Sequence, residues 1–343
     1  MSGACELLCA RAARLLDIVD RWQGRRLLVV GDLVADESVV GRPRAIAREA
    51  PVLLLEQVGR EVLPGGATNL AANARALGAE VDVCGVAGDD ESGRTLLADL
   101  SRRGIGVAGV VVDPTRPTTT KTRIWAGGTQ QHVQQLILRL DRVERSVVAP
   151  AISDRMASYV SGTLSRADAL MLSDYENGVI HPGLIDASLG PALRMGKTVT
   201  VDSHGDLERF KGATLFTPNQ PEAEATLDRQ LPTLAALETG GAELLERLCA
   251  RALLITRGQE GMSLFRVGSA PAHATTFGTA AVDPTGAGDT VAAAFTLAVV
   301  AGADLEDAMT LASLAAAIVV ARVGTAVASH EDVRAAVREL VRD

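Results

Sequence analysis

The chain has 343 residues, enough for one large α/β domain with an appended piece or for two domains. Its formal net charge of −8, from 34 basic and 42 acidic side chains, disfavours a nucleic acid as partner. Hydrophobic residues make up 47% and aromatic residues 3%, which suits Val, Leu and Ala packing in a buried parallel sheet.

Cysteine usage and apolar runs indicate a cytoplasmic protein with no membrane partner. The four cysteines are Cys5, Cys9, Cys84 and Cys249. They form no Cys-x-x-Cys pair, so we expect reduced thiols. Charged residues interrupt the apolar positions of 5–22, which predicts an amphipathic helix and not a signal peptide. The apolar runs 291–303 and 308–320 are each shorter than a membrane span, so we expect core helices.

The first half of the chain alternates between apolar runs and helical patterns. Residues 26–30 predict a buried strand, because they form a short apolar run that ends in glycine. We then expect a helix at 65–77, a strand at 81–86, a helix at 91–103 and a strand at 107–112. This alternation indicates right-handed βαβ units and a parallel central sheet.

Polar side chains in this half are candidates for substrate binding. Asp32 follows the first strand, with Asp36 close behind it, at the edge where open α/β sheets bind ligands. The alternative is that Asp32 only caps the following turn. Asn69 and Asn73 share one face of a predicted helix, and we expect Asn69 to contact a ligand and Asn73 to be structural.

Two stretches outside the alternation predict a small β-sheet. Residues 38–62 contain extended segments around a proline-punctuated loop, and 118–126 with 133–140 form a similar pair. We expect a lid over the active edge, made of segments at about 36–62 and 116–141. Such a lid would exclude water from a reacting phosphate. Self-association is one way to cover its exposed edges.

The second half repeats the rhythm of strands and helices. We expect strands at 167–172, 198–201, 213–216 and 253–255, with helices at 181–194 and from Pro221 onward. Four strand ends in the chain carry polar residues, namely Asp32, Asp174, Asp202 and Asn219. Because the carboxyl ends of parallel strands meet at one edge of a sheet, this set predicts a ligand crevice.

The sequence Asn219-x-x-Glu222 begins a predicted helix and is a candidate metal site. The two side chains lie on one face of the first turn, where with waters they could hold a hydrated Mg²⁺. The alternative is a helix N-cap with an acidic first turn. Farther along, Thr256, Arg257 and Gly258 follow a strand on the expected nucleotide side, and a hairpin through Gly261 comes next.

Other catalytic motifs are missing from the sequence. The stretch 190–198 ends in Gly-Lys-Thr, but its spacing is wrong for a P-loop and it runs from helix to strand. No Gly-x-Gly-x-x-Gly follows the first strand, which disfavours a dinucleotide-dependent oxidoreductase. Of the five histidines, only His204 at a strand end is a functional candidate.

The glycine-rich segment 282–290 is the strongest functional signal. Gly286 and Gly288 flank Ala287 and permit a tight turn before an apolar helix. The free N–H groups of such a helix start bind a phosphate-like anion. Asp289, in the same turn, either caps the helix or takes the proton of an acceptor during phosphoryl transfer.

Two motifs resemble the signatures of the ribokinase-like (PfkB) carbohydrate kinases. Asp283-Pro-Thr-Gly-Ala-Gly-Asp-Thr290 is similar to the C-terminal signature, and Leu63-Pro-Gly-Gly-Ala-Thr-Asn69 to the N-terminal one. The resemblance covers almost all of 24–330 and implies a three-layer ribokinase-like sandwich with a lid. It also implies ATP with Mg²⁺, homodimerisation through the lid, and a possible K⁺ near Asp283 and Thr285.

Site roles follow from the resemblance residue by residue. Asp289 would be the base, and the backbone of Gly286, Ala287 and Gly288 would hold the developing charge. The sugar would lie against one set of residues, namely Asp32, Asp36, Gly65, Gly66, Asn69 and Asp174. The nucleotide would lie against another, namely Asp202, Asn219, Glu222, Thr256, Arg257, Gly258, Gly261 and Ser313.

Within this family the chain is most similar to the kinase half of the bifunctional ADP-heptose synthases. Matching pieces include Glu49-Ala-Pro-Val52, Arg139-Leu-Asp141, Leu172-Ser-Asp-Tyr175 and Arg209-Phe-Lys-Gly-Ala-Thr214. This implies a kinase that phosphorylates a heptose 7-phosphate at its anomeric hydroxyl. We expect a single kinase domain over 1–343 without the nucleotidyltransferase half.

Several positions depart from the heptose kinase pattern and leave alternatives open. An aromatic stretch is replaced by Glu37-Ser-Val39, Asp-Pro-Lys by Asp202-Ser-His204, and a frequent Asn by Ser313. The cations Lys121, Arg123 and Arg139 are candidates for a sugar phosphate, or else solvated charges of the lid. Another PfkB-type sugar, sugar-phosphate or nucleoside kinase, or a non-catalytic nucleotide or sugar sensor, remains as an alternative.

Overall fold

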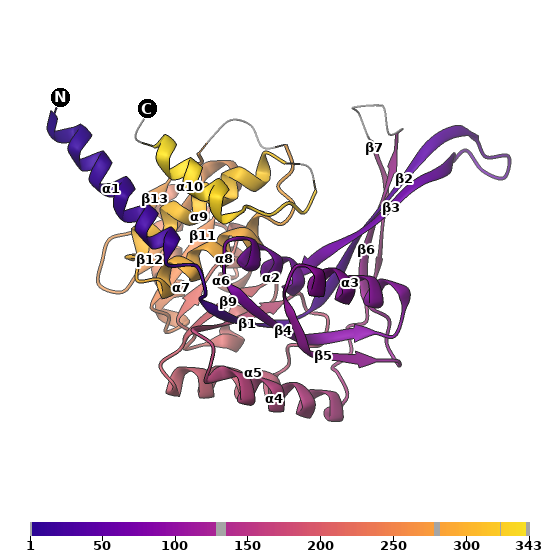
Figure 1. Cartoon of the computed structure of the whole chain (residues 1–343), viewed down its shortest axis with the longest axis horizontal. Coiled ribbons are helices and arrows are strands. Elements are labelled where there is room, and N and C mark those ends of the chain that lie inside the picture. The colour runs from indigo at the N-terminus through magenta and orange to yellow at the C-terminus, as the bar shows by residue number, and fades with distance from the viewer. Residues whose placement is uncertain (1, 128–134, 278–281, 323, 341–343) are drawn as a thin grey trace.

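The computed structural model describes residues 2–127, 135–277, 282–322 and 324–340. Within them a nine-stranded sheet has the order β13-β12-β11-β10-β9-β8-β1-β4-β5 (Figure 1). The strands are β1 (Arg26–Gly31), β4 (Glu80–Gly88), β5 (Gly106–Asp113), β8 (Ala169–Asp174), β9 (Thr198–Ser203), β10 (Leu215–Phe216), β11 (Ala252–Thr256), β12 (Met262–Arg266) and β13 (Ala272–Ala274). Only the pairings β11–β12 and β12–β13 in this sheet are antiparallel, which confirms the predicted α/β class with a mainly parallel sheet.

Helices cover both faces of this sheet, so the strands β1, β8 and β11 are buried along nearly all of their length. One face packs against α1 (Ser2–Asp20), α2 (Ala67–Ala76), α3 (Glu91–Arg102), α8 (Ala287–Val300), α9 (Leu305–Val320) and α10 (His330–Glu339). The other packs against α4 (Pro150–Leu164), α5 (Pro182–Arg194), α6 (Gln220–Leu227) and α7 (Leu234–Arg247). In β1 the side chains of Leu27 and Leu28 enter opposite cores, as the pleat of a doubly covered strand requires.

A separate four-stranded sheet forms the predicted lid, with the order β3-β2-β6-β7. Its strands are β2 (Leu33–Ile46), β3 (Leu53–Gly66), β6 (Thr119–Ala126) and β7 (Gln135–Arg142), and they project from the body in Figure 1. Residues 128–134 of the second lid segment lie outside the described residues. Because β2 follows β1 almost directly and β3 leads into α2, the lid is rooted beside the sheet edge that we predicted to bind ligands.

The structure differs from the sequence prediction in a few elements. The sequence analysis named no element at α4 or α7, and both helices are present. We expected Gly65 and Gly66 to open a helix, but they end β3, and Gly66, with φ of 55°, is the N-cap of α2. A positive φ favours glycine, so this turn is set by backbone freedom and not by periodicity. No helix in the described part of the chain is long and apolar enough to cross a membrane.

Candidate active site

The glycine-rich turn sits where α8 begins against α2. Gly286 has φ of 79° and is the N-cap of α8, and a Cβ on it would lie 2.6 Å from the Asn69 amide nitrogen. Glycine is therefore required twice, by conformation and by contact. A Cβ on Gly288 would meet nothing within 4 Å, so the turn is open on that side. The Ala287 N–H donates to the Pro284 carbonyl, so Ala287 is occupied within the turn and is a poorer anion donor than we expected.

Asp289 is buried in the first turn of α8, with 5% of its surface exposed. The Asn69 amide donates to its Oδ2 at 2.6 Å, and the Tyr175 hydroxyl donates to its Oδ1 at 3.3 Å. Burial raises the pKa of Asp289 to about 6. A carboxylate with its two oxygens held by neutral donors and a pKa near neutrality suits a general base.

The two asparagines of α2 make different contacts. Asn69 reaches Asp289, whereas Asn73 donates to the Asn69 backbone oxygen at 3.0 Å and accepts from Thr290 at 2.8 Å. Asn73 therefore joins α2 to α8 and holds Asn69 beside Asp289. A ligand contact by Asn69 stays a prediction.

Acidic side chains lie at the end of β9 and at the start of α6, and the one on β9 interacts with Asp289. Burial, together with the charges of Asp289 and Glu222, raises the pKa of Asp202 to about 8. His204 forms an ion pair with Glu222 through its Nδ1, and this hydrogen bond raises the pKa of His204 against the opposing effect of burial. Because its pKa is about 8, Asp202 holds its proton near pH 7, and a cation bound nearby would favour its ionised form.

Asn219 and Glu222 form the helix cap that we considered as the alternative to a metal site. The Asn219 side chain accepts from the Glu222 N–H at 2.9 Å, and the Glu222 carboxylate accepts from the Asn219 N–H at 2.8 Å. This capping box orients both groups at the start of α6. Each carboxylate oxygen can accept more than one bond, so the cap does not prevent Glu222 from also contacting a hydrated ion.

The remaining donors fit Mg²⁺ better than a directly ligated transition metal. Among the described residues no group of three or more His, Cys, Asp or Glu side chains could hold a metal ion. Asn219 and Glu222 instead supply few, hard oxygen donors that lie next to one another in the capping box, and the charge of Glu222 also acts on Asp202. Mg²⁺ keeps several waters and takes few protein ligands, which matches this set.

Asp32 and Asp174 lie deeper than the sequence suggested. Asp32 accepts from the N–H groups of Tyr175, Asn177 and Val179, so it holds the turn after β8. Asp174 is 1% exposed and accepts from Arg209 at 2.8 Å. We had expected both to face the sugar, but these contacts favour structural roles, because the oxygens are already enclosed.

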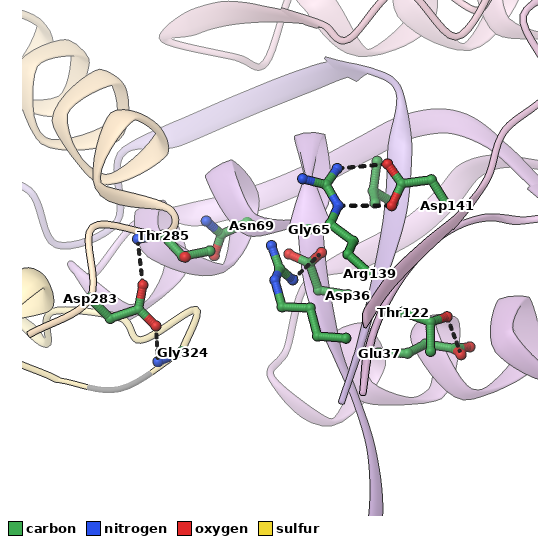
Figure 2. Close-up of polar contacts among 12 residues, drawn as sticks. Asp36, Glu37, Gly65, Asn69, Thr122, Arg139, Asp141, Asp283, Thr285 and Gly324 are labelled. Atoms are coloured by element: carbon green, nitrogen blue, oxygen red, sulfur yellow. Dashed lines mark hydrogen bonds and ion pairs between the residues drawn. The ribbon is translucent and has the colours of Figure 1, made fainter. Parts of the chain in front are cut away.

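Charged side chains of the lid surround Asp36 (Figure 2). Arg123 donates to Asp36 at 3.1 Å, and Arg139 makes two hydrogen bonds to Asp141. Asp36 packs closely against Gly65 of β3, because a Cβ on Gly65 would lie 2.8 Å from Oδ2 of Asp36. The Lys121 ammonium lies 4.6 Å from the Tyr175 ring centre, and burial lowers its pKa. The three predicted cations thus share one side of the site.

The remaining nucleotide candidates make no described contact with Asp289. Thr256 forms a β-bridge with Asn219, and the turn after it runs through Gly258 and Gly261, with φ of 56° and 87°. Ser313 is buried in α9. Arg257 pairs with Glu260.

The predicted cation loop is also well formed. The carboxylate of Asp283 accepts from the N–H groups of Thr285 at 2.9 Å and of Gly324 at 2.9 Å, as Figure 2 shows. These bonds tie the glycine-rich turn to the segment after α9. Thr325 beside it has a buried hydroxyl without a hydrogen-bond partner in the described part of the chain.

Sequence reasoning missed Tyr175 as a functional candidate. We treated it only as part of a matching motif, but its side chain reaches the predicted base. Its position directly after a polar strand end was the available signal. His204 was a candidate, but its partner Glu222 could not be deduced from the sequence. His204 follows β9 and Glu222 lies on α6, and only the folded arrangement of these elements brings them into contact.

Comparisons with known proteins agree on one family. The model of the pfkB family of carbohydrate kinases matches residues 25–332. The chain is 38% identical over 317 residues to the bifunctional protein HldE of Pelobacter propionicus, covering 92% of this chain and 64% of that protein. It is 41% identical over 307 residues to HldE of Geobacter metallireducens, covering 89% and 61%. The chain spans less than two thirds of the length of these relatives.

Solved structures show the same fold at lower identity. Phosphofructokinase-2 from Escherichia coli in complex with potassium has a TM-score of 0.74 and 19% identity, covering 93% of this chain and 99% of that one. Ribokinase from Arabidopsis thaliana complexed with ribose and ATP has a TM-score of 0.70 and 20% identity, covering 94% and 100%. The chain belongs to the PfkB family of carbohydrate kinases, which are phosphotransferases with an alcohol group as acceptor.

Proposed function

We propose that this protein transfers the γ-phosphoryl group of ATP to the anomeric hydroxyl of a heptose 7-phosphate. The expected product is heptose 1,7-bisphosphate, and D-glycero-D-manno-heptose 7-phosphate is the expected substrate. The observation that carries the proposal is Asp289, a buried carboxylate with a pKa of about 6 beside an open glycine turn. The identity to HldE proteins over most of the chain supports the heptose as acceptor.

The residues of the site divide the chemistry between them. Asp289 takes the proton of the acceptor hydroxyl, and Asn69 holds its Oδ2. The N–H groups of Gly286 and Gly288, at the start of α8, lie at the positive end of the helix dipole and stabilise charge on the moving phosphoryl group. The lid excludes water when it covers the acceptor.

Cations complete this proposal. Asn219 and Glu222 would hold Mg²⁺ through water, and the ion would neutralise charge on the ATP phosphates. A monovalent cation such as K⁺ would lie near Asp283 and Thr285, where the loop is already ordered by hydrogen bonds. The buried hydroxyl of Thr325, which has no hydrogen-bond partner among the described residues, supports this position.

The 7-phosphate of the acceptor would lie against the lid cations. Arg123 and Arg139 are paired with Asp36 and Asp141, whereas Lys121 makes its described contact with an aromatic ring. Burial lowers the pKa of Lys121, so a dianion beside it would be stabilised by an ammonium that has lost part of its hydration. Lys121 is therefore the cation of this group that is best placed to exchange its present contact for a phosphate.

The lid also supports a homodimer. Large apolar side chains of the lid are exposed, among them Ile46 at 61%, Leu138 at 51% and Leu140 at 60%. Exposed apolar side chains on a sheet favour association, and we propose a second lid as their cover. Sedimentation of Leu138→Glu should show a monomer where the unmodified chain is a dimer, and an unchanged dimer would refute this assembly.

The expected location is the cytoplasm, where ATP and sugar phosphates are present.

The acceptor is tested by ADP release with Mg-ATP across a panel of heptose 7-phosphate, fructose 6-phosphate, ribose, fructose and adenosine. We expect selective turnover of the heptose phosphate. Selective turnover of another member would keep the kinase chemistry and replace the acceptor, which is the main alternative. Binding of ATP without turnover of any member would favour a nucleotide or sugar sensor.

A further inference from the structure

Tyr175 connects the two sides of the site through its aromatic ring. Its N–H donates to Asp32 Oδ2 at 2.7 Å, which fixes the backbone just after β8. The Lys121 ammonium from the lid lies 4.6 Å from the ring centre. The His204 ring lies 4.3 Å away in an edge-to-face arrangement. The ring is therefore held from the lid side and from the nucleotide side at once.

The hydroxyl of this fixed ring points at the base. Burial and the charge of Asp289 raise the pKa of Tyr175 well above its usual value, so the phenol stays protonated and donates. The bond to Asp289 Oδ1 is 3.3 Å, whereas the bond from Asn69 to Oδ2 is 2.6 Å. A carboxylate oxygen accepts two hydrogen bonds, so Oδ1 is the less tightly held oxygen and has room for a second donor.

We propose that Tyr175 is a positioning residue for proton transfer, which holds Asp289 so that Oδ1 is the oxygen that receives the acceptor proton. The proposal rests on Asp289 being the base of the proposed kinase reaction. In that step the acceptor oxygen bonds to the γ-phosphorus while the bond from phosphorus to the bridging oxygen of ADP breaks. The acceptor O–H bond breaks as well, and its proton passes to Asp289 Oδ1.

Loss of the Tyr175 hydroxyl has a directional effect on this carboxyl. The charged groups that act on Asp289 come from several elements, namely Asp36 on β2, Lys121 on β6, Asp202 on β9 and His204 after it. Tyr175→Phe keeps the ring and leaves all of them in place. It removes one donor to the charged form of the carboxyl, so the pKa of Asp289 must rise.

The test compares the pH profile of kcat in Tyr175→Phe and in a matched control. The chain has only one other tyrosine, Tyr159 on α4, which packs beside Gly109 and away from Asp289. For Tyr175→Phe we expect kcat to fall roughly 10-fold near pH 7, with the acid limb displaced to higher pH and part of the loss recovered at pH 9. KM for ATP should stay within about 3-fold, while Tyr159→Phe should follow the unmodified profile.

The shape of the profile separates the possible results. The folded fraction of Tyr175→Phe is measured by circular dichroism at each pH, and kcat is given per folded enzyme, so that poor folding cannot imitate a displaced limb. A kcat that falls equally at every pH, or that rises, would overturn the positioning role and leave the kinase proposal intact. An Asp289→Asn variant with near-normal turnover would overturn the base itself, and the role of Tyr175 with it.

Discussion

The enclosed ion pair between Asp174 and Arg209 gives a stability prediction that separates structure from substrate binding. Asp174 is 1% exposed and accepts from Arg209 Nη1 at 2.8 Å, from Ser203 at 3.2 Å and from the Glu176 N–H at 3.0 Å. Arg209 also donates to the Ile180 carbonyl at 2.6 Å. Asp174→Asn keeps the shape of the side chain but leaves the guanidinium without its counter-charge.

Removal of one partner of a buried ion pair costs about 3–5 kcal/mol. The Arg209 side chain is 28% exposed, so water recovers part of the loss and the lower end applies, about 3 kcal/mol. At roughly 2–4 °C per kcal/mol this corresponds to a Tm lower by roughly 6–12 °C. KM for the sugar should change less than about 3-fold, because in this account the carboxylate does not touch the substrate.

The assay is urea unfolding and thermal melting of Asp174→Asn, with steady-state kinetics on the folded enzyme. Asp186→Asn is a matched control, since Asp186 is an exposed residue of α5, and its stability should stay within about 0.5 kcal/mol. Unchanged stability of Asp174→Asn together with a tenfold higher KM for the sugar would refute the structural role and restore the substrate contact.

Four further predictions concern the carboxylates and their partners. Because burial raises the pKa of Asp289 to about 6, wild-type kcat should fall as pH drops through about 6, and a flat profile from pH 5 to 8 would contradict this. For the same reason the folded state binds the Asp289 proton more tightly than the unfolded chain does, so the fold loses stability as pH rises and the carboxyl ionises. Asp289→Asn should therefore have a higher Tm than the unmodified chain at pH 8, and the difference should vanish below about pH 4. Glu222→Gln should keep the helix cap, because glutamine also reaches back to the N-cap. In a Mg²⁺ titration the variant should need a several-fold higher Mg²⁺ concentration for half-maximal activity. An unchanged Mg²⁺ requirement would show that Glu222 is not part of the metal site. Asn69→Ala deletes the 2.6 Å donor to Asp289 and should lower kcat by roughly 10-fold or more in steady-state assays, whereas a change in KM alone would assign Asn69 to substrate binding only.

Hydrophobic periodicity was sufficient for the fold because the strands are covered on both faces. The apolar runs at 26–30 and 81–86 are the interiors of β1 and β4, and the proline-punctuated stretch 38–62 became lid strands. Two helices, α4 and α7, were missed. The buried hydrophobic residues of α7 are separated by glycines and charged residues within 234–247. The apolar face of this helix is therefore narrow, and its helical period is hard to detect in the sequence.

The site was only partly predictable, because strand ends place residues but do not orient them. Asp289 and Asn69 meet across 220 positions of sequence, and a motif on each side was enough to bring them together. Asp174 lies at the predicted edge, yet Arg209, 35 residues later, encloses its carboxylate. No local pattern reports such a contact, and none reports that the Tyr175 hydroxyl lies against Asp289.

The central claim is that Asp289 is the base of a sugar kinase, and Asp289→Asn tests it most directly. Turnover with heptose 7-phosphate and ATP affinity should be measured side by side, by ADP release and by calorimetry with Mg-ATP. The account predicts a kcat lower by roughly 10²–10⁴-fold and an ATP Kd within about 3-fold of the unmodified enzyme, because the carboxylate acts on the acceptor proton and not on the nucleotide. Turnover close to that of the unmodified enzyme, with ATP bound normally, would contradict it.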